Sequence, residues 1–132
     1  MTIELTIGKL AGAAGVNVET IRYYQRRGLL DEPTKPLAGH RRYSSQMSKR
    51  VRFIKRAQAL GFTLSEIGGL LQLEKATSCA ETRALATRKL ALIEEKMADL
   101  AIMRQALGDL VRQCDIGGEN TACPIIEALA QE

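Results

Sequence analysis

The sequence has no tryptophan, only one histidine, three prolines and three cysteines among its 132 residues. It also has no CxxC pair and no glycine-rich phosphate loop, so the usual catalytic motifs are missing and we do not expect an enzyme. No apolar run is long enough to span a bilayer. The first residues, MTIELTIGKLAG, lack the basic start and apolar centre of a signal peptide. We therefore expect a cytoplasmic protein.

The three cysteines, Cys79, Cys114 and Cys123, are an odd number at uneven spacing. In a reducing cytoplasm this pattern disfavours a disulfide framework and favours metal or redox chemistry. Three sulfur ligands without a histidine or carboxylate partner select soft, thiophilic ions, and each would bind as a thiolate. The alternative is that the cysteines are small buried apolar side chains, a common role of free cysteine.

An apolar stripe with heptad spacing joins two of these cysteines. Between Cys114 and Cys79 it passes, in steps of three and four, through Val111, Leu107, Arg104, Leu100, Met97, Ile93, Leu90, Ala86 and Arg83. This spacing predicts one helix from about Cys79 to Gln113 that pairs with a partner helix. At 1.5 Å per residue, an unbroken helix would hold Cys79 and Cys114 roughly 50 Å apart, too far to share an ion within one chain.

Antiparallel pairing of two such helices would remove this separation, because Cys79 of one chain would lie beside Cys114 of the other. Cys123 follows a break at Gly117 and Gly118 and could fold back to the same place. The sequence thus predicts a pocket of three thiolates, Cys79, Cys114 and Cys123, that is shared across a homodimer and occurs twice in it.

Charge is divided unevenly along the chain. Residues 1–60 hold 12 Lys/Arg against 4 Asp/Glu, net +8, whereas residues 61–132 hold 7 against 11, net −4. A basic first half joined to an acidic, heptad-bearing second half suggests a polyanion-binding domain on a dimerisation stalk. The alternative is a solvated basic face with no partner.

Caps and breakers divide the chain into short elements. They predict helices over 6–14, 18–27, 45–60, 63–73 and 79–113, a hairpin over 29–44, and a short helix begun by Pro124. Thr63 and Glu66 form a capping box. Val51, Ile54 and Leu60 are expected in the core. The domains expected are 1–75 for DNA binding, 76–114 for dimerisation and 115–132 for metal binding.

The helix over 18–27 carries Arg22, Tyr23, Arg26 and Arg27, and neighbours at three and four residues share a face. Arginine suits guanine edges and phosphates, as a recognition helix requires. A second basic group, His40, Arg41 and Arg42, is expected at the hairpin tip, where it would grip flanking backbone as a wing.

Three segments in this order carry a resemblance to a known family: TIGKLA…GVNVETIRYYQRRGLL, then GHRRY, then FIKRAQALGFTLSEI. They resemble the winged helix-turn-helix domain of the MerR family of transcriptional regulators. The resemblance implies a mainly α fold, with that domain followed by a long antiparallel dimerisation coiled-coil helix and a short C-terminal metal-binding loop and helix. It implies DNA contacts from Arg22, Tyr23, Tyr24, Arg41 and Arg42, and Arg26 is expected to join them because it shares the basic face of its helix. Tyr43 could equally belong to the core.

The cysteine pattern, ending in CPIIE, resembles that of the mercury-responsive members of this family. This likeness implies a homodimer on double-stranded promoter DNA that represses without metal and activates with Hg(II), with RNA polymerase as a second partner. Three alternatives remain open: a Cd(II), Pb(II) or Zn(II) sensor, a thiol redox sensor, and a constitutive DNA-binding architectural dimer.

Overall fold

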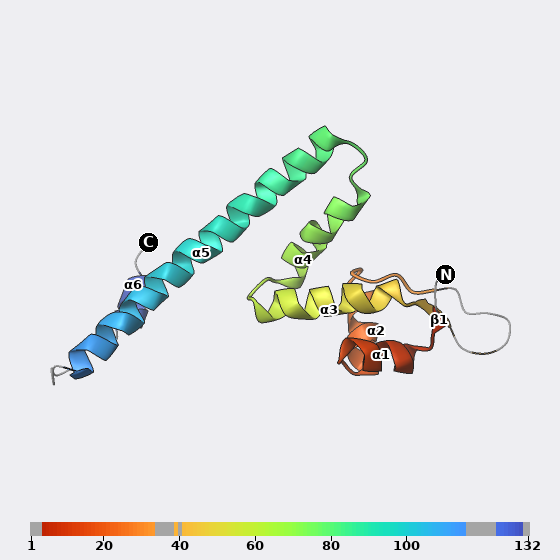
Figure 1. Ribbon diagram of the computed structural model, residues 1–132, viewed down its shortest axis with the longest axis horizontal. Helices are drawn as coiled ribbons and strands as arrows, with labels where there is room; N and C mark the ends of the chain where they lie inside the picture. The colour runs from red at the N-terminus through yellow and green to blue at the C-terminus, as the bar shows by residue number, and fades with distance from the viewer. Residues whose placement is uncertain (1–3, 34–38, 40, 116–123, 131–132) are drawn as a thin grey trace. The chain divides into compact units, whose positions relative to one another are not determined.

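The structure, a computed structural model, describes residues 4–33, 39, 41–115 and 124–130 (Figure 1). The chain divides into two compact units, residues 1–77 and 78–132. The first unit contains β1 (Glu4–Leu5), α1 (Ile7–Ala14), α2 (Val18–Arg26), β2 (Tyr43–Ser44), α3 (Gln46–Ala59), α4 (Leu64–Leu71) and a 3-10 helix, η1 (Gln72–Lys75). The second contains α5 (Cys79–Asp115) and α6 (Pro124–Ala130). The predicted mainly helical fold is confirmed.

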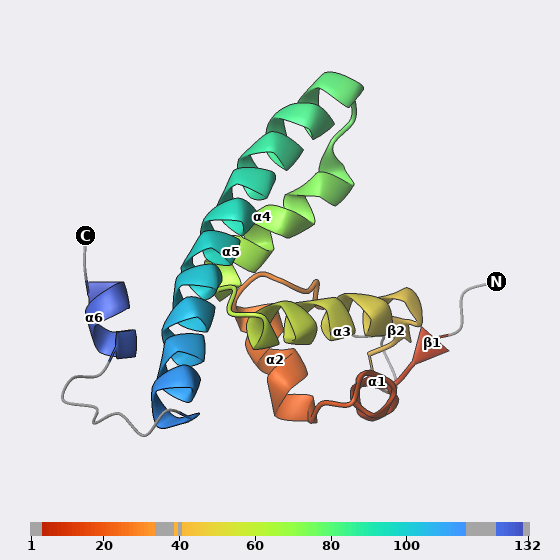
Figure 2. The same cartoon turned by 60° about the vertical axis from the view of Figure 1, so that its left-hand side comes forward.

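The first two helices begin and end where local chemistry predicts. The Thr6 hydroxyl accepts from the backbone N–H of Lys9 at 3.3 Å and caps α1. Gly15 closes that helix at φ 71°, a left-handed conformation that a residue without Cβ adopts at little cost. The Asn17 side chain caps α2 by accepting from Thr20 N at 2.8 Å. The tight turn between the two caps makes the pair a helix-turn-helix, packed against α3 (Figure 2).

The capping box predicted for α4 is present: Thr63 Oγ1 accepts from Glu66 N at 3.1 Å, and Glu66 Oε1 accepts from Thr63 N at 2.8 Å. The start of α3 is less regular, since Ser45 makes no side-chain cap bond and Ser44 Oγ accepts from Gln46 N instead. The predicted helix end at Leu73 falls within η1, where the chain tightens from α-helix to 3-10 helix.

The strand pairing differs from the predicted hairpin. Tyr43–Ser44 pairs antiparallel with Glu4–Leu5 at the start of the chain, in the register Glu4 to Ser44 and Leu5 to Tyr43. Within the described part of residues 29–44, Tyr43–Ser44 is the one strand. Residues 34–38 of the predicted hairpin lie outside the described residues.

One core holds the first unit together. Leu10, Ile21, Val51, Ile54 and Ile67, from all four helices, are completely buried in it. Leu60, expected in the core, is instead 65% exposed, and it lies at the C-terminal cap of α3, after the last helical residue. Tyr43 is 2% exposed, so its ring belongs to the core.

In the second unit, α5 runs unbroken for 37 residues, as its heptad pattern predicts. Ser78 caps it by accepting from Glu81 N at 3.1 Å. The short helix α6 begins at Pro124, as predicted, and packs against α5, where Ala106 is the one buried residue of that long helix. The part of the chain that the structure describes contains no candidate membrane-spanning helix.

Candidate nucleic-acid interface and thiol positions

The helix α2 has an inward and an outward face. Ile21 and Tyr24 point into the core, whereas Arg22, Tyr23 and Arg26 are exposed. This division follows from helical spacing, since residues three apart lie on one side. The outward face therefore presents two cations and a phenol on a helix that the cap at Asn17 and the core hold rigid.

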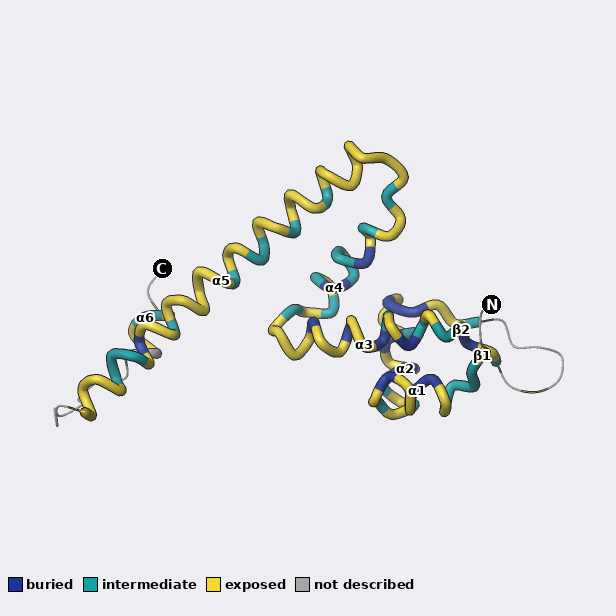
Figure 3. Tube along the Cα trace, viewed as in Figure 1, coloured by how far each residue is buried: buried dark blue, intermediate teal, exposed yellow. Residues whose placement is uncertain are grey.

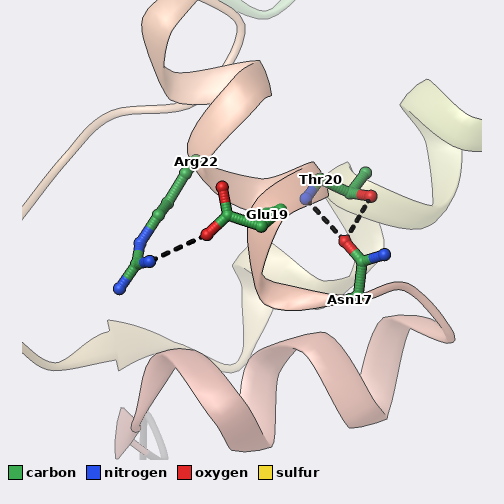
Figure 4. Close-up of polar contacts among 4 residues, drawn as sticks. All are labelled: Asn17, Glu19, Thr20 and Arg22. Carbon is green, nitrogen blue, oxygen red and sulfur yellow. Dashed lines mark hydrogen bonds and ion pairs between the residues drawn. The ribbon is translucent and has the colours of Figure 1, made fainter.

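The exposed side chains of α2 are arranged by contacts within the helix. Arg22 Nη1 lies 2.9 Å from Glu19 Oε1, and this ion pair joins residues in successive turns of the helix (Figure 4). The guanidinium of Arg26 lies 5.9 Å from the centre of the Tyr23 ring, in cation–π range. Both arginines keep exposed surface, so a polyanion can reach them.

Arg41, expected in the wing, is held by the segment after α2. Its Nη2 lies 3.2 Å from Glu32 Oε1, and its Nε donates to the Pro33 carbonyl at 3.1 Å. Arg42 is exposed beside it. His40 lies outside the described residues.

An open pocket of about 640 Å³ lies between α2, the start of α1 and the segment around Arg41. Three arginines line it: Arg22 and Arg26 from α2 and Arg41 from the segment before β2. Ile7 and Gly8, in the first turn of α1, line the same pocket. The first backbone N–H groups of a helix carry a partial positive charge, so four cationic or partly cationic groups converge here. An anionic oxygen group is the ligand that fits such a lining.

Sequence reasoning missed several groups at this pocket. Glu32 lines it, and Glu19 pairs with one of its arginines. Gln25 also lines it, and its Nε2 donates to the Tyr43 hydroxyl at 3.2 Å. The Glu19–Arg22 pair was readable from its i, i+3 spacing. The positions of Glu32 and Gln25 depend on contacts between separate parts of the chain.

Tyr24 does not fit the direct DNA contact predicted for it. Its side chain is 2% exposed, and its hydroxyl donates to Gln58 Oε1 at 2.6 Å. Burial, with a smaller effect of neighbouring Tyr23, raises the pKa of Tyr24 above the usual range of a tyrosine. We assign Tyr24 to the α2–α3 packing, while Tyr23, 40% exposed, keeps the outward position.

Three of the five basic residues in the middle of α3 make contacts within the protein. Lys55 Nζ donates to the Gly15 carbonyl at 2.8 Å, and Arg52 Nη1 donates to the Ala13 carbonyl at 3.1 Å. Cations at the C-terminal end of a helix are favourable because its last carbonyls are unpaired. Arg50 likewise bridges α3 to η1 through Glu74 at 2.6 Å. Some of the basic residues of α3 therefore stabilise the fold through contacts with neighbouring elements.

Cys79 and Cys114 are free and exposed, and they stand at the first and next-to-last positions of α5. Because the helix is unbroken between them, its rise separates them by roughly 50 Å. Cys123 lies outside the described residues. Within 4–33, 39, 41–115 and 124–130 no group of three metal-ligating side chains occurs.

Most of α5 is exposed in the single chain (Figure 3), and this includes most of its heptad stripe. Five of its large apolar members are 48–63% exposed, and Ile93 is half-buried; the five are Leu90, Met97, Leu100, Leu107 and Val111. The helix α6 does not cover them, because it lies by a shallow hollow lined by Ala101, Ile102, Gln105, Ala106, Asp109 and Ala128, off the stripe. An exposed row of large apolar side chains of this length marks an interaction surface.

Known protein families share both parts of this arrangement. The sequence pattern of the MerR HTH family regulatory proteins matches residues 5–74, and that of the MerR DNA-binding family matches residues 48–110. A mercuric resistance operon regulatory protein from Pseudomonas fluorescens is 55% identical over 126 residues, which cover 96% of this chain and 88% of the relative.

Two solved structures resemble this one along almost the whole chain. The regulator MerR of Bacillus megaterium, in complex with mercury(II), is 39% identical at a TM-score of 0.53, covering 96% of this chain and 100% of the other. A transcription regulator of Ralstonia metallidurans, in complex with lead(II), is 35% identical at a TM-score of 0.54, covering 95% and 98%.

Proposed function

Because the chain belongs to the MerR family of helix-turn-helix transcriptional regulators, we propose that it controls a mercury-resistance operon in response to Hg(II). Family membership also confirms that it is not an enzyme. The observation that carries the proposal is the position of Cys79 and Cys114 at the two ends of one exposed apolar seam.

The DNA-binding surface in this proposal is the outward face of α2 with the segment around Arg41. Arg22, Tyr23 and Arg26 enter the groove or meet its phosphates, and Arg41 and Arg42 hold flanking backbone. The pocket lined by three arginines and the first turn of α1 supports a phosphate contact between these two elements.

The seam of α5 is the dimer interface in this proposal. Two copies paired antiparallel would bury the exposed Leu90, Met97, Leu100, Leu107 and Val111 of both chains. Only this orientation brings Cys79 of one chain to Cys114 of the other. Pairing the helices in parallel would bring like cysteines together at opposite ends of the dimer, two at each end.

The metal site then consists of Cys79 from one chain and Cys114 and Cys123 from the other. Support for including Cys123 is that α6 begins at the next residue and packs against the half of α5 that ends in Cys114. Three thiolates suit Hg(II), which two or three sulfurs satisfy, and leave Zn(II) one ligand short of its usual four. Each cysteine gives up its proton on binding, so metal affinity rises with pH.

In this proposal the switch is a change in the shape of the promoter DNA. Without metal the dimer holds both half-sites and represses; with Hg(II) it deforms the promoter so that RNA polymerase, bound in both states, can start. Such a change requires Hg(II) to bind the activating state more tightly, by a few kcal/mol.

A lead(II) sensor is the second candidate, because a regulator 35% identical to this chain was solved in complex with lead(II). The test is competition among Hg(II), Pb(II), Cd(II) and Zn(II) for the purified dimer, followed by sulfur-to-metal charge-transfer absorption. We expect Hg(II) to displace the others and to activate transcription in vitro at the lowest concentration. Displacement of Hg(II) by Pb(II) would favour the second candidate, and equal activation by Zn(II) would contradict both.

A further inference from the structure

Two of the three arginines in the α2 pocket already hold a carboxylate. Arg22 is paired with Glu19 at 2.9 Å, and Arg41 is paired with Glu32 at 3.2 Å. The third, Arg26, lies over the Tyr23 ring and has no ion pair among the described residues. A pocket that fits an anion is thus partly occupied by the protein's own carboxylates.

Neither carboxylate is buried in the core. The side chains of Glu19 and Glu32 are 70% and 55% exposed, and those of Arg22 and Arg41 are 54% and 41% exposed. Exposed ion pairs of this kind contribute little to folding stability. Their geometry matters more for binding, because a guanidinium held by a carboxylate presents fewer N–H groups to a phosphate.

We propose that Glu19 and Glu32 are internal competitors of DNA phosphate, which occupy Arg22 and Arg41 in the free protein and weaken its binding to DNA. This inference rests on the proposed function, since it takes the α2 pocket as part of the DNA-binding surface. On binding, each arginine exchanges its carboxylate for a phosphate oxygen. The cost of this exchange applies to every duplex, whereas base contacts made only at the operator offset it there. The two glutamates would thereby restrain non-specific binding.

The experiment measures binding of the full-length chain to a short fluorescein-labelled duplex of random sequence, by anisotropy at fixed low salt. Glu19→Gln and Glu32→Gln remove the charge and keep the shape. Since an exposed ion pair is worth up to about 1 kcal/mol, we expect each variant to bind about two- to fivefold more tightly. Glu94→Gln, an exposed glutamate on α5, makes the same change in net charge and is the matched control, with unchanged binding expected.

A double-mutant cycle separates competition from a general charge effect. In an Arg22→Gln background, Glu19→Gln should give no gain, and in an Arg41→Gln background, Glu32→Gln should give none. A gain that persists in both backgrounds, or unchanged or weaker binding by the single variants, would overturn the proposal. Failure of the wild-type chain to bind DNA at all would instead overturn the proposed function.

Discussion

Cys79 and Cys114 stand at opposite ends of α5, a single helix of 37 residues, and both are exposed. The helix fixes their separation at roughly 50 Å, so one chain cannot use both on one ion. Most of the large apolar residues in the stripe between them are exposed in the single chain. Antiparallel pairing of two chains along this stripe would bury its apolar residues and bring Cys79 of one chain beside Cys114 of the other.

Leu100→Lys should therefore prevent dimer formation. Leu100 is 59% exposed in the single chain and lies near the middle of the seam, where a buried ammonium would have no partner. Ala91→Lys, also exposed on α5 but outside the stripe, should leave the dimer intact. Sedimentation equilibrium measures the difference. A Leu100→Lys chain that remains dimeric would place the interface elsewhere.

Arg22→Ala should weaken binding to promoter DNA by tenfold or more, since a good base contact is worth about 1–3 kcal/mol. Metal uptake should be unchanged, because Arg22 and the thiols belong to different units of the chain. Footprinting on the promoter and charge-transfer absorption test the two halves of this prediction. A wild-type footprint would remove Arg22 from the recognition surface.

Tyr24→Phe should destabilise the first unit by about 0.5–1.5 kcal/mol, because it removes a hydrogen bond to Gln58. The variant should also change the response to alkali. Burial raises the pKa of Tyr24 in the folded state above its usual value, so the folded protein holds this proton more tightly than the unfolded chain. The resulting stabilisation is present below pH 10 and is lost as pH rises through the folded pKa.

Urea titrations at pH 8 and above pH 10 measure this effect, with Tyr23→Phe, at an exposed position, as the control. Tyr24→Phe should lose less stability between the two pH values than the wild type loses. An equal loss in both proteins would mean that another group causes the alkaline sensitivity.

Lys55→Ala should lower the free energy of unfolding by about 0.3–1 kcal/mol, because Lys55 donates to the Gly15 carbonyl at the end of α1. Lys49→Ala, which removes an exposed lysine from the same helix, should cost less. The difference should shrink at high salt, which screens a charge at a helix terminus. Equal effects of the two substitutions would contradict a capping role for Lys55.

Features set by neighbouring residues were predictable from the sequence, and features set by distant contacts were not. The caps at Thr6, Asn17 and Thr63 lie within three residues of the groups they bind, so their spacing is visible in the chain. The pairing of β1 with β2 joins residues about 40 positions apart through two-residue strands, too short for a pattern of alternation.

The same distinction between local and long-range contacts applies to the candidate site. Tyr23 and Tyr24 are adjacent and chemically alike, and the resemblance assigned both to DNA. Tyr24 lies three residues after the buried Ile21 and packs inward against Gln58, whereas Tyr23 is exposed. The glutamate partner of Arg41 and the carbonyl partners of the α3 cations were likewise hidden, because each contact joins separate elements.

The most direct test of the account is complementation between two defective chains. A Cys79→Ala chain and a Cys114→Ala/Cys123→Ala chain, each carrying a different affinity tag, are mixed, and the purified heterodimer is titrated with Hg(II) under thiol competition. Each homodimer alone should lack tight binding, whereas the heterodimer should regain one complete pocket and bind one Hg(II). A heterodimer that binds no better than its parents, or a Cys79→Ala homodimer that binds like the wild type, would contradict a thiolate site shared between chains.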